Sequence, residues 1–570
     1  MESIALPQYC KKNTRPSTHQ SMNRLSKGYI WIPLIAAIAF AGGVLSDTLL
    51  RDRGGRSDGE KKLSNLLNLI GSEYVDIVNT DSLIEKSLPN LLSNLDPHSV
   101  YIPASDLQMV NEELDGSFSG VGVHFTINND TIHVLEATNG GPSERAGIKS
   151  GDRIIAVDGE NVAGTGITNE QVFKLLRGER GSTVKLTIKR NSAPSPIDFE
   201  VTRGDIPVTS IDAEYMVADS IGYIKVNKFG RTTYDEFFQA LFALRDAGAK
   251  DYIIDLRGNT GGLLETSVLM ANEFLPRGQK IVETRGRRTQ ENSVVVSDGY
   301  GAFKDSRITV LIDEASASSS EIFAGAIQDN DRGLIIGRRS FGKGLVQNQI
   351  DLPDGSAVRL TVARYYTPSG RCIQKDYSDA KSYENDLYDR YTRGEAFEAD
   401  SIHFDETKLF VTMHGRKVYG GGGIMPDIFV PDDTVGITKY YINVFNQGLL
   451  QKFSLEYVDN NREHLEEAFD VNELISLLPS DLQLIQQFAK FTKSHGIDTQ
   501  WSYINNSAPL IVNQLKALIA RDILGFGAYY EISNMMDTTV MSAIEQLRAG
   551  KADFPITDSK EAKAYPADRQ

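Results

Sequence analysis

Four serines stand directly before an apolar stretch in DEASASSSEIFAGAIQD, residues 313–329: Ser316, Ser318, Ser319 and Ser320. A serine hydroxyl becomes a nucleophile when a neighbouring base takes its proton. Ser318, followed three residues later by Glu321, also fits the capping box that begins a helix. Both roles can coincide, because free N–H groups at a helix N-terminus stabilise an oxyanion. The stretch predicts a helix and a candidate nucleophile, with a purely structural cap as the alternative.

A nucleophilic serine needs a base, and the eight histidines show no partner motif. Lys343, in GLIIGRRSFGKGLVQ, is the candidate because it follows an apolar strand and is flanked by Gly342 and Gly344. Burial favours the neutral amine and lowers the pKa of a lysine, so that the amine can accept a proton. No carboxylate lies among its near neighbours in the sequence. A solvated lysine in a turn is the alternative.

Two motif matches fail in their context. Residues 337–343 match GxxxxGK, the start of a phosphate-binding P-loop. Position 344 is glycine, however, and the following LVQNQIDLP favours a strand where that motif needs a helix. Residues 55–59 match GxSxG, but they lack the strand before and the helix after that a nucleophile elbow requires. We therefore expect neither nucleotide binding nor an elbow.

Length and charge limit the class of protein. A chain of 570 residues with 41% hydrophobic content can form several domains. Its 60 Lys and Arg against 76 Asp and Glu give a net charge of −16, which repels phosphate backbones and argues against nucleic acid as a partner. Cys10 and Cys372 offer no disulfide framework and no metal-site spacing. We expect no metal and no cofactor.

One uncharged run, residues 28–46, has the length that crosses a membrane as a helix. Lysines and arginines before it favour a cytoplasmic N-terminus, although further basic residues after it weaken the asymmetry. We expect residues 1–50 to form the N-terminus and anchor, with the rest exported to the periplasm or outside the cell. Secretion after signal cleavage is the alternative, because Ala39-Phe40-Ala41 has the small-x-small pattern of a cleavage site.

The remaining chain divides by its pattern into further segments. Residues 51–62 are polar and glycine-rich and indicate a linker, whereas 63–113 show helical spacing typical of a small cap or scaffold. Residues 114–204 hold short strand-like runs between glycine turns. From 205 to 435 strands alternate with helices, which predicts an α/β core with a largely parallel sheet, interrupted by a charged, tyrosine-rich insertion at 375–415. Residues 436–570 favour helices and end in a tail that we expect to be disordered.

The module at 114–204 resembles a PDZ domain through SGVGVHF and GPSERAGIKSGDRIIAVDGENV. The resemblance implies that backbone N–H groups of Gly120, Val121, Gly122 and Val123 hold the terminal carboxylate of a peptide, while the next strand pairs with that peptide. The alternative is that Gly120 and Gly122 only permit a tight turn.

Six features in this order resemble the C-terminal processing peptidases, also called tail-specific proteases: LDPHSVYI, the PDZ-like module, DLRGNTGGLLE, SASSSEIFAGAIQD, RRSFGKGLVQ and GGGIMPDI. The resemblance covers about residues 60–430 and implies a crotonase-like core of ββα repeats. It implies that Ser318 is the nucleophile, Lys343 the base and Gln347, four residues later on a predicted strand, the group that orients the amine. An exposed strand glutamine is the alternative for Gln347.

The same resemblance implies oxyanion N–H groups from Ser319 and from Gly261 or Gly262, between which the sequence does not choose. The family usually has alanine after its nucleophile, so the hydroxyl of Ser319 could crowd the site or compete for Lys343. The glycines could also serve only as a strand-to-helix turn.

We therefore expect a membrane-anchored serine endopeptidase whose partners are proteins or peptides with free apolar C-termini. A homo-oligomer or adaptor contact through the C-terminal helices is a further expectation. The alternatives are a non-catalytic PDZ-bearing envelope scaffold and a crotonase-like acyl-thioester enzyme.

Overall fold

The computed structural model describes residues 57–191, 193–403 and 405–555. The chain forms two compact units, Met1–Ser87 and Leu88–Gln570. In the described residues no helix is long and apolar enough to span a bilayer. The predicted membrane segment 28–46 and the tail from 556 onward lie outside the described residues.

The first unit holds α2 (Asp58–Glu73) and the start of α3 (Thr80–Leu92). The Ser57 N–H donates to Glu60 Oε2 at 3.0 Å, and the Glu60 N–H donates to Ser57 Oγ at 3.2 Å. This reciprocal capping box starts the helix inside a polar segment. The prediction of a linker over 51–62 is therefore wrong from Asp58 onward, because local capping outweighs composition there.

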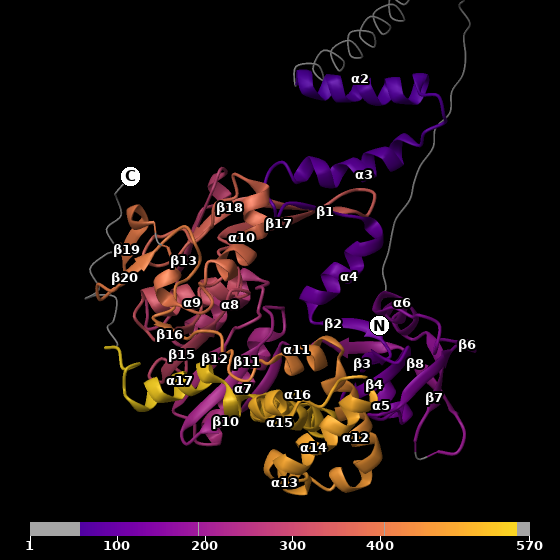
Figure 1. Cartoon of the computed structure of the whole chain (residues 1–570). Helices are drawn as coiled ribbons and strands as arrows, with labels where there is room; N and C mark the ends of the chain where they lie inside the picture. The colour runs from indigo at the N-terminus through magenta and orange to yellow at the C-terminus, as the bar shows by residue number, and fades with distance from the viewer. Residues whose placement is uncertain (1–56, 192, 404, 556–570) are drawn as a thin grey trace, which may run out of the picture. The chain divides into compact units, whose positions relative to one another are not determined.

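The second unit begins with two short elements and then the module that resembles a PDZ domain (Figure 1). The short elements are β1 (Val100–Ile102) and α4 (Ala104–Asp115). Strands β2 (Ser117–Gly120) and β9 (Gly204–Pro207) pair with each other where the chain enters and leaves the domain. The domain sheet has the order β3-β4-β5-β7-β8, with β6 paired to β5. Its elements are β3 (Val123–Asn128), β4 (Thr131–Ala137), α5 (Pro142–Ala146), β5 (Arg153–Val157), β6 (Glu160–Asn161), α6 (Asn169–Leu176), β7 (Thr183–Lys189) and β8 (Ile197–Thr202).

A six-stranded sheet forms the α/β core, in the order β10-β11-β12-β15-β16-β21. All neighbouring pairs are parallel except β10 with β11, so the largely parallel sheet is confirmed. The strands are β10 (Ile211–Ala218), β11 (Ile221–Val226), β12 (Asp251–Asp255), β15 (Arg307–Ile312), β16 (Leu334–Gly337) and β21 (Ile428–Phe429).

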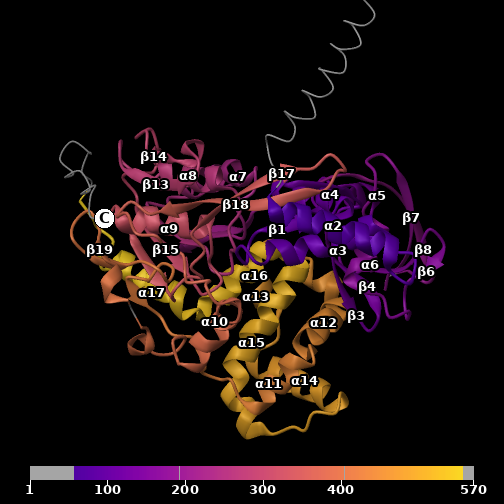
Figure 2. The ribbon, with the colours of Figure 1, turned by 90° about the horizontal axis from the view of Figure 1, so that it is seen from above.

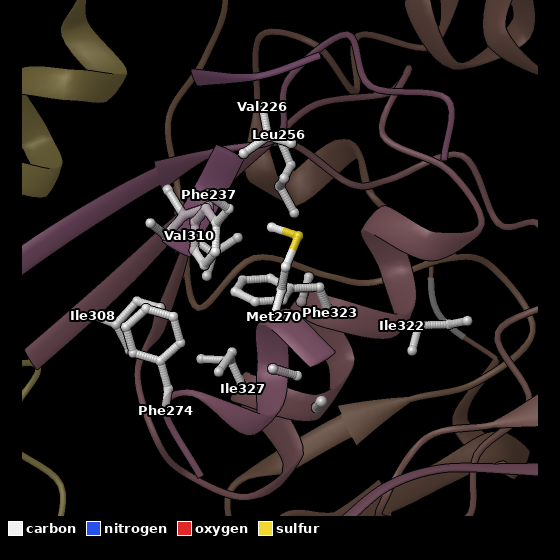
Figure 3. Packing of buried hydrophobic residues seen from close by; sticks show 14 of the residues in the cluster. Val226, Phe237, Leu256, Met270, Phe274, Ile308, Val310, Ile322, Phe323 and Ile327 are labelled. Atoms are coloured by element: carbon white, nitrogen blue, oxygen red, sulfur yellow. The ribbon is translucent and has the colours of Figure 1, made fainter. Parts of the chain in front are cut away.

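Alternating residues of these strands face two helical layers, as the two-residue period of a strand requires. One face packs on α7 (Thr233–Asp246), α8 (Leu264–Asn272) and α9 (Ser319–Asp329). Figure 3 shows Val226, Leu256 and Val310 packed against Met270 and Phe323 of these helices. The other face carries Tyr223 and Leu311 against α17 (Thr538–Arg548). Because α9 lies in the core, its N-terminus is held rigidly.

A second, antiparallel sheet has the order β1-β18-β13-β14, with β17 also paired to β18. Its other strands are β13 (Lys280–Gly286), β14 (Ser293–Val296), β17 (Leu345–Asp351) and β18 (Ala357–Tyr366), and η1 (Thr289–Glu291) lies between β13 and β14. Strand β17 confirms the strand predicted after Lys343 and is incompatible with a P-loop helix. Through β18, this sheet brings the segment before β1 close to β17.

The predicted insertion contains a helix and a small hairpin, and the described chain beyond 436 is largely helical, as predicted. The insertion holds α10 (Ala380–Thr392), η2 (Ala399–Ser401), η3 (Glu406–Lys408), β19 (Leu409–Val411) and β20 (Lys417–Tyr419). The C-terminal elements are α11 (Lys439–Asn446), α12 (Leu449–Leu465), α13 (Val471–Leu477), α14 (Asp481–Ser494), α15 (Trp501–Leu524), α16 (Phe526–Ser533) and η4 (Asn534–Met536), followed by α17.

The C-terminal helices contact both the PDZ domain and the core (Figure 2). Asp459 pairs with Arg153 of the PDZ domain, and the Phe526 ring meets the His124 ring at 5.8 Å. On the other side, Asp537 at the start of α17 pairs with Arg257 of the core at 2.8 Å. The oligomer or adaptor contact expected for these helices stays a prediction.

Candidate active site

Ser318 lies at the turn between β15 and α9, in a strained backbone conformation. Its torsions are φ 55° and ψ −114°, and residues other than glycine rarely adopt a positive φ. Such a conformation costs about 1–3 kcal/mol and persists only where the surrounding structure enforces it. Enforced strain of this kind is concentrated at functional sites.

The other three serines of the run use their hydroxyls to hold the turn. Ser316 Oγ donates to the Leu256 carbonyl at 2.8 Å, and Ser320 Oγ donates to the Asn259 carbonyl at 2.9 Å. Ser319 Oγ donates to the Gly262 carbonyl at 2.9 Å. Ser318 is the one serine of the four whose hydroxyl donates to no acceptor in the described part of the chain. The hydroxyl of Ser319 is thus turned toward the glycine turn and not toward Lys343.

Glu321, predicted only as a helix cap, joins the Ser318 turn to the Lys343 loop. It is fully buried, and each of its carboxylate oxygens accepts two hydrogen bonds. Oε2 accepts the N–H groups of Ser318 and Lys343, both at 2.9 Å. Oε1 accepts the Gly342 N–H at 2.7 Å and the Ser340 hydroxyl. Burial raises the pKa of Glu321, and these donors act against that rise.

Glu321→Gln should destabilise the fold and slow the reaction, because the new NH₂ group would face two donors where an oxygen accepted them. We expect a loss of about 2–3 kcal/mol in the free energy of unfolding. Urea titration and a cleavage assay would measure both effects. Glu384→Gln, on the exposed side of α10, is the matched control and should change neither. Wild-type stability in Glu321→Gln would contradict this role.

Lys343 lies two residues before β17 in a half-buried position. Its Nζ donates to Gln347 Oε1 at 3.2 Å, so the structure brings this predicted pair together. Lys343 precedes the strand and the register shifts between Val346 and Gln347, so the contact does not depend on a shared face of a regular strand. Burial, and then the positive charge of Arg359, lower the pKa of the Lys343 amine. A lowered pKa is what a lysine general base requires.

The glycine turn after β12 lies against the Ser318 turn. A Cβ on Gly261, at φ 103°, would lie 2.7 Å from Ser318 Cβ and 3.0 Å from the Ser319 nitrogen. The Gly261 N–H donates to Asn259 Oδ1 at 2.8 Å. The N–H groups of Gly262 and Ser319 have no acceptor among the described residues. Of the two glycines, Gly262 is therefore the one whose backbone N–H is available to bind an oxyanion.

A buried charge cluster anchors that turn. Arg257 donates to both oxygens of Asp255, with Nη2 2.6 Å from Oδ2, and the Tyr223 hydroxyl donates to Oδ2 at 2.7 Å. Burial alone would raise the pKa of Asp255, but the charges of Arg257 and Lys225 hold it well below its usual range. The cluster lies directly before the glycine turn, so its hydrogen bonds fix where that turn begins. Asp255 and Arg257 belong to the DLRGNTGGLLE stretch, but the stretch alone does not predict this cluster.

The structure brings Ser318 and Lys343 together through their backbones. The Tyr365 hydroxyl lies 3.0 Å from the Ser318 carbonyl oxygen and 2.7 Å from the Lys343 carbonyl oxygen. No hydrogen bond joins Ser318 Oγ directly to Lys343 Nζ in the described chain, where the amine donates to Gln347 instead. Such catalytic hydrogen bonds often tighten only when substrate is bound. The described residues hold no group of His, Cys, Asp and Glu side chains that fits a metal ion.

The predicted peptide loop of the PDZ domain joins β2 to β3. The carbonyls of Val121 and Gly122 accept the N–H groups of Ser143 at 2.9 Å and Thr138 at 3.1 Å. The N–H groups of Val121 and Gly122 have no acceptor among the residues that the structure describes. Gly122 has a φ of 74°, which favours glycine, and a Cβ there would also lie 2.7 Å from Ile206 Cδ1. Free amides in a tight loop suit a carboxylate.

The fold and the site together define a serine peptidase that carries a PDZ domain. Residues 220–380 match the model of peptidase family S41, residues 133–190 match a PDZ domain, and residues 440–525 match a family of unknown function. A carboxy-terminal-processing protease of Bartonella bacilliformis is 37% identical over 319 residues, which are 55% of this chain and 72% of that protein. The chain belongs to peptidase family S41, in the group of the carboxy-terminal-processing proteases.

Two further relatives match a similar share of this chain. A probable CtpA-like serine protease of Staphylococcus haemolyticus is 34% identical over 314 residues, which are 55% of this chain and 62% of that protein. The solved photosystem II D1 C-terminal processing protease is 27% identical, with 64% of this chain and 91% of that one covered and a TM-score of 0.32.

Proposed function

We propose that the chain is an exported serine endopeptidase that trims or degrades proteins recognised by their C-terminal tails. Ser318 is the nucleophile, Lys343 the general base and Gln347 the group that orients the amine. The observation that carries the proposal is Glu321, whose one buried carboxylate holds the strained Ser318 turn and the Lys343 loop together.

The reaction follows from these positions. Neutral Lys343 takes the Ser318 proton as Oγ attacks a peptide carbonyl, and the ammonium then gives that proton to the leaving amine. Water releases the acyl group from Ser318 by the same route. The N–H groups of Ser319 and Gly262 stabilise the oxyanion, and the Ser319 hydroxyl supports this role by donating to the Gly262 carbonyl.

The PDZ domain supplies substrate recognition, with the Val121 and Gly122 N–H groups as donors to the terminal carboxylate of a peptide. Anchoring through residues 28–46 places the catalytic region in the periplasm or outside the cell, with secretion after signal cleavage as the alternative. The uncharged run 28–46 supports this placement.

An unstructured protein with a free apolar C-terminus should bind and be cleaved, whereas the same chain with an amidated C-terminus should bind about 10- to 100-fold more weakly, because charge-assisted hydrogen bonds are lost. Calorimetry on the inactive Ser318→Ala protein measures the binding, and gel analysis of the wild type measures the cleavage. Equal binding of both forms would contradict the carboxylate loop. Binding without any cleavage would favour the non-catalytic scaffold.

A further inference from the structure

The turn before β1 carries a residue, His98, that contacts the candidate active site. Asp96 Oδ1 accepts the N–H groups of His98 and Ser99, both at 2.8 Å, and the hydroxyl of Thr361 at 3.1 Å. Asp96 is buried, and β1 then pairs with β18. These contacts fix the backbone of His98 relative to the second sheet.

The carbonyl of His98 accepts a hydrogen bond from Gln347 Nε2. An amide side chain has one donor end and one acceptor end. With its NH₂ group held by His98, Gln347 must turn its Oε1 toward Lys343, whose Nζ lies 3.2 Å away. The position of His98 therefore decides which end of Gln347 faces the lysine.

The ring of His98 is held in turn by the insertion. Its Nε2 lies 2.6 Å from the Tyr383 hydroxyl of α10, and the two rings meet edge to face with centroids 5.6 Å apart. Burial, and then the positive charge of Lys343, lower the pKa of His98 to about 4. The ring is therefore neutral at neutral pH and can accept the hydroxyl proton of Tyr383.

Tyr383 is itself fixed against the loop that carries Lys343. Lys375 Nζ lies 4.2 Å from the Tyr383 ring centroid and 3.9 Å from that of Phe341, and it pairs with Asp386 at 2.9 Å. Arg390, also on α10, donates to the Ser340 carbonyl at 2.7 Å. The helix thus contacts both the loop of Lys343 and the turn that orients Gln347.

We propose that Tyr383 is a positioning residue for the Gln347–Lys343 pair, acting through the His98 ring, so that the 375–415 insertion is a working part of the peptidase. This inference rests on the proposed function. It assigns a role to the LDPHS stretch and to the insertion, neither of which lies next to the candidate dyad in sequence.

Tyr383→Phe tests the contact in the full-length protein, because it removes only the hydroxyl and keeps the ring packing. Tyr388→Phe, at an exposed tyrosine of the same helix, is the matched control. The readouts are kcat and KM for an unstructured substrate and the rate at which a fluorophosphonate probe labels Ser318. We expect Tyr383→Phe to lower kcat and the labelling rate about 10- to 100-fold with KM unchanged. Tyr388→Phe should match the wild type.

A double-mutant cycle separates positioning from general damage. In a Gln347→Ala background, Tyr383→Phe should cost nothing further, because the residue through which it acts is gone. His98→Phe should reproduce the Tyr383→Phe loss, and it serves as the second variant if Tyr383→Phe does not fold. Wild-type rates in a folded Tyr383→Phe protein, or full losses in the Gln347→Ala background, would overturn the inference alone. A wild-type protein whose Ser318 is neither labelled nor needed for cleavage would overturn the proposed function.

Discussion

Ser318→Ala should abolish peptide cleavage, with kcat lower by about 10⁴-fold or more, because no other group can form the acyl intermediate. The fold should survive, since the Ser318 hydroxyl donates to no acceptor in the described chain and both backbone contacts of this residue to Glu321 and Tyr365 stay. Cleavage of an unstructured protein, followed on gels, and thermal melting together measure the two effects.

Ser316→Ala is the control for this experiment. Its hydroxyl is buried and donates to the Leu256 carbonyl, so its loss should lower the melting temperature while cleavage continues. Ser318→Ala should therefore lose activity and keep its stability, whereas Ser316→Ala should lose stability and keep its activity. Cleavage that persists in Ser318→Ala would show that the nucleophile lies elsewhere.

Lys343→Met should also abolish cleavage, because methionine fills the same space without a base. In the wild type, kcat should rise with pH along a limb below the ordinary lysine pKa of 10.5, since burial and Arg359 lower the pKa of Lys343 and only the neutral amine accepts the Ser318 proton. Any residual activity of Lys343→Met should not show this rise of kcat with pH. Lys417→Met, at an exposed lysine, should keep the wild-type profile.

The lowered pKa of Lys343 also makes the stability of the fold depend on pH. The folded pKa of Lys343 is lower than the unfolded one, so the unfolded chain binds more protons between the two values and stability rises with pH across that window. Below the folded pKa, the buried ammonium costs stability, and Lys343→Met removes that cost. We therefore expect Lys343→Met to melt no lower than the wild type at neutral pH. A lower melting temperature, or a flat pH profile of the wild type, would contradict a desolvated base.

Motifs located Ser318, Lys343 and Gln347 because each belongs to a short stretch of characteristic residues. The same motifs showed Glu321 only as a local cap, since its contact with Lys343 spans 22 residues and depends on how α9 meets the next loop. Gly261 and Gly262 are alike in sequence, and only the hydrogen bond from Gly261 to the Asn259 side chain distinguishes them.

Sequence patterns did not predict contacts between residues that lie far apart in the chain. His98 and Tyr383 are 285 residues apart, and no periodicity or spacing connects them. The parallel core and the helical C-terminus were predicted because alternation of strands and helices and helical spacing extend over many residues. The prediction of a linker over 51–62 was partly wrong, because a capping box formed by Ser57 and Glu60 starts a helix there.

The torsion angles of Ser318 also restrict which amino acids can occupy the position. Threonine offers the same hydroxyl, yet a β-branched side chain at a φ of 55° is a severe steric outlier. Cysteine has an unbranched side chain and meets no such barrier from the backbone. The backbone at this turn therefore permits a change of nucleophile from serine to cysteine. It excludes threonine, because the β-branched side chain does not fit the φ of residue 318.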